Sequence, residues 1–92
     1  MIVNIKLDQP YQEGDIVETR LWDLNLKPTK QTGKAEIIHG PIPCSTVDQE
    51  IYKSKWRYDA MLLDKIILSN GEVYGIGKAV TIYQFNIRRK VN

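Results

Sequence analysis

Apolar and polar residues alternate with a period of two along much of the chain, which is the pattern of strands with one buried face. In residues 15–22, for example, Val17 and Leu21 alternate with Glu18 and Arg20. Further short runs rich in β-branched and aromatic residues predict strands at residues 2–7, 35–39, 50–60, 60–68, 72–74 and 79–87. The pattern therefore predicts an all-β fold.

Glycine and proline mark where these strands turn. Asn70-Gly71 is the strongest hairpin signal, because both central positions of a type I′ turn need a positive φ. Residues 23–34 are mostly polar and include one proline and one glycine, so we expect a loop there. Pro41 and Pro43 are expected to end the preceding strand, since proline cannot donate to a central ladder.

Ser45 and Thr46 carry the clearest helix-start signal. Either hydroxyl can cap a helical turn, but no sustained helical spacing follows them. The sequence therefore predicts a turn or a short 3₁₀ segment at this place.

The length of 92 residues supports one hydrophobic core. We expect a single domain over residues 1–92, with residues 88–92 as a candidate flexible tail. A flat sheet of this size would leave apolar faces and edges exposed. The chain is therefore expected to form a small barrel, or a strongly curved antiparallel sheet, of about five to seven strands.

The order of elements resembles that of small SH3-like barrels. The motif Gly-Asp-Ile-Val at 14–17 opens a strand, and a long polar loop, a hairpin and a final strand follow. This broad group includes KOW-type modules and short phage or plasmid proteins that open with a Gly-Asp-hydrophobic strand. The resemblance covers residues 13–87 and implies an SH3-like barrel, with a phage or plasmid protein as a further expectation.

Charge is unevenly distributed along the chain. Residues 1–52 hold five Lys or Arg and eight Asp or Glu, whereas residues 53–92 hold eight basic and three acidic residues. A basic C-terminal part fits an anionic partner.

A single cysteine excludes an intrachain disulfide, and no apolar run is long enough to span a membrane. We therefore expect a cytoplasmic protein without membrane contact.

The stretch IYKSKWRYD at 51–59 concentrates cations and aromatic rings. If it forms one strand, alternation places Lys53, Lys55 and Arg57 together on one face. Cations at alternate positions stand about 7 Å apart, which suits successive phosphates of a nucleic-acid strand. The leading hypothesis is a non-catalytic binding module, or accessory protein, for RNA or DNA. Its expected footprint comprises Lys53, Lys55, Arg57, Lys78, Arg88, Arg89 and Lys90.

Two other interpretations of this stretch remain open. In the first, Trp56 and a tyrosine pack on the core, and the lysines sit in water where they protect an edge strand from aggregation. In the second, Trp56 or Tyr58 is exposed beside the cations and stacks on bases, which requires the strand to lie at a rim.

Protein interaction is the alternative class of function. Trp22, Leu24 and Leu26 form an apolar cluster just before the polar loop. They are expected either to anchor the loop on the core or to form a contact for another protein, as in an assembly factor that binds through Trp22–Lys34. Both a monomer and a homodimer formed through an edge strand agree with the sequence.

Catalytic chemistry has little support in the sequence. His39, Cys44 and Asp48 suggest a nucleophilic site, but prolines constrain the chain between the histidine and the cysteine. One His and one Cys are too few ligands for a structural zinc site. The glycines after residue 70 match no phosphate-binding loop. We therefore expect no enzyme activity, no metal and no cofactor.

Overall fold

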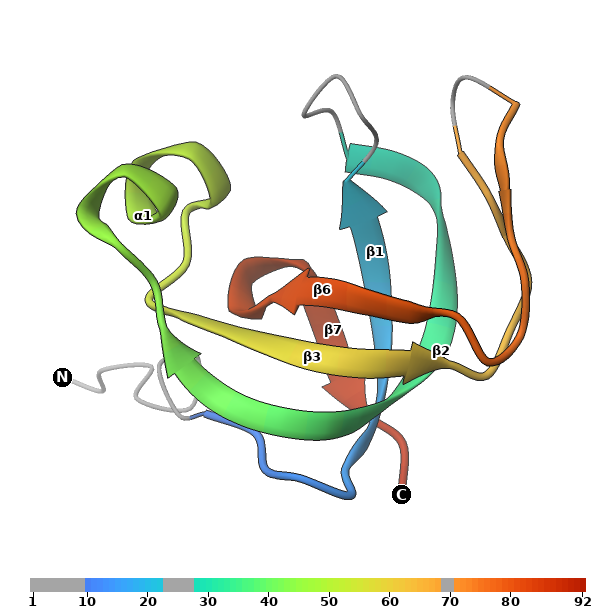
Figure 1. Cartoon of the computed structure of the whole chain (residues 1–92), viewed down its shortest axis with the longest axis horizontal. Helices are drawn as coiled ribbons and strands as arrows, with labels where there is room; N and C mark the ends of the chain where they lie inside the picture. The colour runs from blue at the N-terminus through green and yellow to red at the C-terminus, as the bar shows by residue number, and fades with distance from the viewer. Residues whose placement is uncertain (1–9, 23–27, 69–70) are drawn as a thin grey trace, which may run out of the picture.

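Strands make up most of the protein (Figure 1). The computed structural model describes residues 10–22, 28–68 and 71–92. The strands in this part of the chain are β1 (Ile16–Trp22), β2 (Pro28–Pro43), β3 (Trp56–Leu62), β4 (Ile66–Ile67), β5 (Val73–Tyr74), β6 (Ala79–Tyr83) and β7 (Ile87–Lys90). The helical segments are α1 (Thr46–Tyr52) and the 3₁₀ helix η2 (Gln84–Asn86). The prediction of an all-β fold is confirmed.

Five antiparallel strands form one sheet in the order β6-β3-β2-β1-β7, and β4 and β5 form a separate pair. The long strand β2 produces the curvature. Its first part pairs with β1 and its last part pairs with β3, while Ala35 and Glu36 pair with both neighbours. Figure 1 shows β2 sweeping around one side of the molecule between these two partners.

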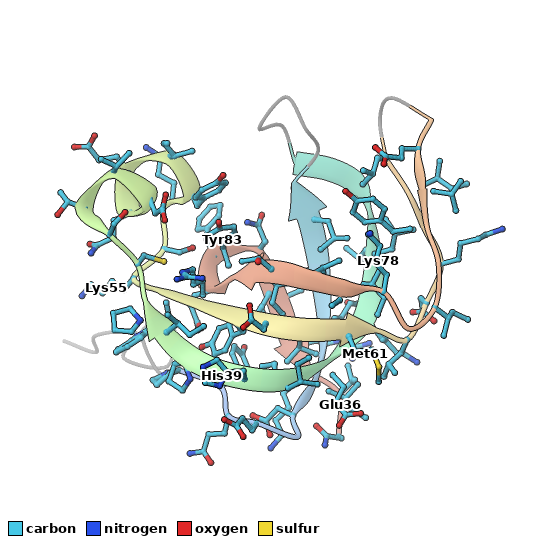
Figure 2. The ribbon with its side chains drawn as sticks, in the orientation of Figure 1. Glu36, His39, Lys55, Met61, Lys78 and Tyr83 are labelled. Atoms are coloured by element: carbon cyan, nitrogen blue, oxygen red, sulfur yellow. The ribbon has the colours of Figure 1, made fainter. Side chains whose placement is uncertain are left out.

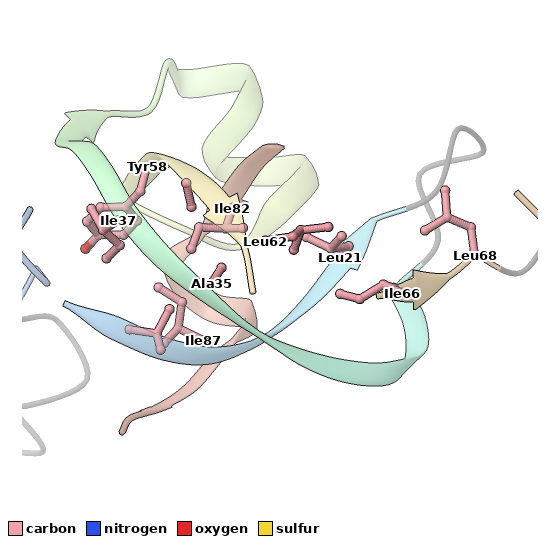
Figure 3. Packing of buried hydrophobic residues seen from close by; sticks show 11 residues of the cluster. Leu21, Ala35, Ile37, Tyr58, Leu62, Ile66, Leu68, Ile82 and Ile87 are labelled. Carbon is pink, nitrogen blue, oxygen red and sulfur yellow. The ribbon is translucent and has the colours of Figure 1, made fainter. Parts of the chain in front are cut away.

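The core lies on the inner side of this curved sheet (Figure 3). In β1 the buried residues Val17 and Leu21 alternate with half-buried Glu18 and Arg20, as the sequence predicts. In β3 the buried residues recur at every second position. The buried cluster comprises Val17, Leu21, Ala35, Ile37, Tyr58, Ala60, Leu62, Ile66, Leu68, Ile82 and Ile87.

The predicted loop at residues 23–34 is wrong in its second half, because β2 already begins at Pro28. The strand also continues through Pro41 and Pro43. The pairing of β1 with β2 reaches no further than Glu36, so both prolines lie where β2 is paired on one side. The backbone N–H that each proline lacks is therefore not needed for the hydrogen bonds between β1 and β2.

The stretch 51–59 is not one strand. Helix α1 runs through Tyr52, Lys53 then takes the left-handed conformation with φ 55°, and β3 starts at Trp56. The Ser45 hydroxyl caps the helix by accepting the Asp48 N–H at 3.1 Å. The cap was predicted, but the segment is a seven-residue α-helix rather than a single turn.

The apolar run at 60–68 is also divided. Strand β3 ends at Leu62, and the chain turns at Asp64, whose carboxylate accepts the Lys34 N–H at 2.9 Å. Strand β4 then pairs with β5, which confirms the predicted hairpin. Gly71 has a φ of 87°, whereas Asn70 lies outside the described residues.

The predicted strand at 79–87 is interrupted by η2, after which β7 pairs with β1. Residues 88–90 therefore form an edge strand instead of a tail. The Val91 N–H donates to the Ile16 carbonyl at 2.8 Å, and the Ile16 N–H donates to Asn92 Oδ1 at 2.9 Å. These bonds hold the C-terminal residues against β1.

Candidate functional site

An open cavity of about 600 Å³ lies where α1 ends, β3 begins and η2 leads into β7. Its volume is in the range typical of ligand-binding sites. Among the described residues that line it, the charged ones are all basic, namely Lys53, Lys55 and Arg88. The aromatic residues that line it are Tyr11, Trp56 and Phe85. We call this cavity the basic–aromatic groove.

The three cations come from two distant parts of the chain. Lys53 follows the last helical residue of α1, and Lys55 lies two positions further, just before β3. Arg88 belongs to β7, at the edge of the sheet. All three residues are exposed. No carboxylate is found among the described residues that line the groove, so the charges on its described lining all have one sign.

Phe85 and Trp56 present aromatic surface to the same groove. Phe85, in the middle of η2, is 66% exposed. Trp56 is half-buried and packs against the core cluster. Strict alternation along one strand would have separated Trp56 from the lysines. They share the groove because β3 begins at Trp56, so Lys53 and Lys55 lie outside the pleated strand.

Ser54 joins the two sides of the groove. Its hydroxyl donates to the Tyr52 carbonyl at 3.0 Å and accepts the Phe85 N–H at 2.9 Å. The residue is only 5% exposed, so water competes little for these bonds. Ser54 therefore fixes the end of α1 against η2.

Helix α1 is also held on the sheet by two stacked rings. Tyr52 of α1 and Tyr83 of β6 lie with their centroids 3.8 Å apart and their planes 8° apart. Burial, together with the neighbouring Tyr52 hydroxyl, raises the pKa of Tyr83 to about 12. The stack sets the position of α1, and hence of Lys53, relative to β6.

A hydrogen-bond chain through the buried Tyr58 joins two residues of the groove lining, Tyr11 and Gln84. The Tyr58 hydroxyl accepts the Tyr11 N–H at 2.8 Å and donates to Gln84 Oε1. Burial raises the pKa of Tyr58 to about 12, so the hydroxyl keeps its proton near neutral pH and remains a donor. This chain ties the segment before β1 to β3 and η2.

The other predicted cations lie elsewhere. Lys78 sits 4.7 Å from the centroid of the Tyr74 ring, and Figure 2 shows it far from Lys55. In β7, Arg89 pairs with Glu18 at 3.5 Å. Lys90 pairs with Asp15 at 3.3 Å. The half-buried Arg57 is not part of the groove lining.

Phe85 and Tyr11 were missed by the sequence prediction. Phe85 was placed inside a continuous strand at 79–87, and the segment around Tyr11 carried no pattern. One signal was present, because polar Gln84 and Asn86 flank Phe85 and break the β-branched run of β6.

The residues considered for nucleophilic chemistry do not form an activated pair. His39 Nδ1 lies 3.7 Å from Glu13 Oε2, and both side chains are exposed. Burial raises the pKa of the Cys44 thiol, the Asp48 charge adds to this effect, and Arg57 opposes it. A raised pKa disfavours the thiolate that nucleophilic attack needs. Within the part of the chain that the structure describes, no three His, Cys, Asp or Glu side chains gather as a metal site.

The side chains of the apolar cluster proposed for protein interaction are not among those that the structure describes. Leu24 and Leu26 lie outside the described residues, as does the side chain of Trp22. The backbone of Trp22 ends β1 and pairs with Pro28. Binding of another protein through Trp22–Lys34 stays a prediction.

No protein-family model, curated protein or solved structure matches the chain. Among the described residues, no helix has the length and apolarity needed to cross a membrane.

Proposed function

We propose that the protein is a non-catalytic module that binds nucleic acid through the basic–aromatic groove. The observation that carries this proposal is the gathering of Lys53, Lys55 and Arg88 around one cavity with no acidic residue among its described lining. Such a cavity attracts a polyanion, and each phosphate bound displaces condensed counterions.

Ion pairing distinguishes the other cations of β7 from the three cations of the groove. Arg89 and Lys90 each have a carboxylate partner. Lys53, Lys55 and Arg88 make no ion pair with any residue that the structure describes. Clustered like charges repel one another unless an external anion lies between them. The footprint that we propose is therefore narrower than the one expected from sequence.

The SH3-like type of barrel is part of the same proposal. It is supported by the succession β1-β2-β3-β6, in which each strand is antiparallel to the one before it, and by the return of β7 to pair with β1. The type of barrel concerns only how the strands that carry the groove are arranged. It does not by itself specify a ligand.

Fluorescence anisotropy with labelled RNA and DNA, at low and near-physiological salt, tests the proposal. We expect binding that weakens with salt, with a slope of log K against log salt of about −2 for two or three phosphate contacts. Lys53→Glu/Lys55→Glu should reduce the affinity about tenfold or more. Polyglutamate at matched charge should compete poorly, because it offers carboxylates without bases.

The matched control is Lys65→Glu/Lys78→Glu, which changes the net charge equally at exposed positions outside the groove. It should retain most of the affinity. An equal loss in both double variants would mean that net charge alone drives binding. Equally effective competition by polyglutamate would indicate an acidic protein partner. Either result, or no binding at low salt, would overturn the proposal.

A further inference from the structure

The exposed ring of Phe85 is displayed on a firmly held turn. The backbone of Phe85 is bound to Ser54, and its neighbours in η2 are also anchored. Gln84 Oε1 accepts the Tyr58 hydroxyl, and the Asn86 carbonyl accepts the Thr19 hydroxyl at 3.1 Å. An apolar ring kept in water between two anchored neighbours is preorganised for contact with another flat, apolar surface.

Cations line the same groove as this ring. Ser54, which binds the Phe85 N–H, lies between Lys53 and Lys55 in the chain, and all four residues line the groove. Trp56 contributes a second, half-buried ring. A positive groove with aromatic rings is the combination that holds single-stranded nucleic acid, since phosphates meet the cations and bases stack on the rings.

The shape and charge of the same region disfavour a duplex. In a duplex the base faces are covered by neighbouring bases, and sequence is read by a helix or ribbon that enters a groove of the DNA. Here the site is a cavity, and the neighbouring exposed helix α1 carries Asp48 and Glu50 but no basic residue. Phosphates on both sides of a DNA groove would repel that helix.

We propose that the ligand is a single strand, with a base stacked on Phe85 and phosphates held by Lys53, Lys55 and Arg88. This inference rests on the proposed function and specifies its ligand. Ribose and deoxyribose strands share this chemistry, so both are measured.

The test compares three oligonucleotides of equal length: an unstructured single strand, its duplex, and a single strand with abasic sites in place of bases. The abasic strand keeps the phosphates and removes the stacking partner. The wild-type chain should bind the intact strand about tenfold more tightly than the other two. Phe85→Ala should lose about tenfold for the intact strand and almost nothing for the abasic strand.

Two variants serve as controls for Phe85→Ala. Phe85→Tyr keeps an aromatic ring and should keep the affinity. Ile76→Ala removes another exposed apolar side chain, 73% exposed and outside the groove lining, and should leave binding unchanged. Circular dichroism confirms that each variant folds.

The outcomes distinguish this inference from the proposed function. Equal affinity for all three ligands, or an unchanged affinity in Phe85→Ala, would overturn the single-strand inference. If Lys53→Glu/Lys55→Glu still reduced the affinity about tenfold or more in that case, phosphate binding at the groove would stand. Absence of binding to every oligonucleotide would overturn both.

Discussion

The backbone amide of Phe85 donates a 2.9 Å hydrogen bond to the hydroxyl of Ser54, across 31 positions of sequence. This bond places an exposed aromatic ring next to a serine that has a lysine on each side. The buried Ser54 hydroxyl thus joins the end of α1, which leads to the lysines, to η2, which carries the aromatic ring. The geometry of the groove should therefore depend on Ser54 more than on any of its charged residues.

Ser54→Ala should lower the free energy of unfolding by about 1–2 kcal/mol, because the Phe85 N–H loses its acceptor. It should also weaken binding of a single strand, since η2 is no longer fixed against α1. Urea unfolding and anisotropy measure the two effects. Ser45→Ala is the matched control, because it removes the cap of α1 at a cost of about 1 kcal/mol and lies outside the groove. If both variants weakened binding equally, the special role of Ser54 would be refuted.

Lys53→Gly should make the protein more stable and a poorer binder. A side chain at φ 55° is strained, so glycine should raise the free energy of unfolding by up to about 1 kcal/mol, reduced by its greater freedom in the unfolded chain. Loss of one phosphate contact should make the salt slope shallower by about 0.7. Thermal unfolding and salt-dependent anisotropy test this. Asparagine also tolerates the left-handed conformation, so Lys53→Asn should lose as much affinity as Lys53→Gly. If neither variant changed the affinity, Lys53 would be excluded from the site.

Gly40→Ala should destabilise the protein by roughly 2–4 kcal/mol. Gly40 has a φ of 135°, and an added Cβ would lie 2.9 Å from Cδ1 of the buried Tyr58 ring. Gly75→Ala is the control, because open space surrounds its Cβ position and its φ is not in the left-handed region. It should change stability by less than about 0.5 kcal/mol. Similar losses in both variants, measured by urea unfolding, would contradict the steric explanation.

Stability should fall as the pH rises from about 10 to about 12. Burial raises the pKa values of Tyr58 and Tyr83 from 10.0 to about 12. Because the folded state holds these protons more tightly than the unfolded state, the stabilisation is complete below pH 10.0 and is lost as the pH approaches 12. Tyr83→Phe should reduce this alkaline loss while keeping the ring stack with Tyr52. Phenolate absorbance follows the ionisation of the tyrosines, and circular dichroism follows the loss of structure. Titration of all five tyrosines near pH 10 would contradict the raised pKa values of Tyr58 and Tyr83.

The sequence predicted β1 and the β4–β5 hairpin well, because each depends on local chemistry. The alternation in β1 follows directly from which side chains face the core, and Gly71 permits the positive φ of its turn. The prediction failed at Ile51–Asp59, where the alternation extends across a helix end and a strand start. Nothing in a period-two pattern reveals that Lys53 leaves the helix in a left-handed conformation.

The candidate site was predicted in part. Lys53, Lys55 and Arg88 were among the expected cations, and the structure brings these three together. Unlike Arg88, Arg89 and Lys90 have carboxylate partners. Arg89 pairs with Glu18 of the neighbouring strand β1, and Lys90 pairs with Asp15, the residue before β1. Partners so distant in sequence cannot be inferred from the composition of a basic tail.

By itself, the sequence determined the strand-rich character of the chain, the inward residues of β1 and the excess of positive charge after residue 52. These follow from side-chain type and from the periodicity of neighbouring residues, which are local properties. Only the tertiary structure decided that Phe85, Trp56 and three cations share a groove, because the return of β7 to β1 and the bond from Ser54 to Phe85 bring distant segments together. Packing of the whole sheet selects such long-range contacts, and no local pattern encodes them.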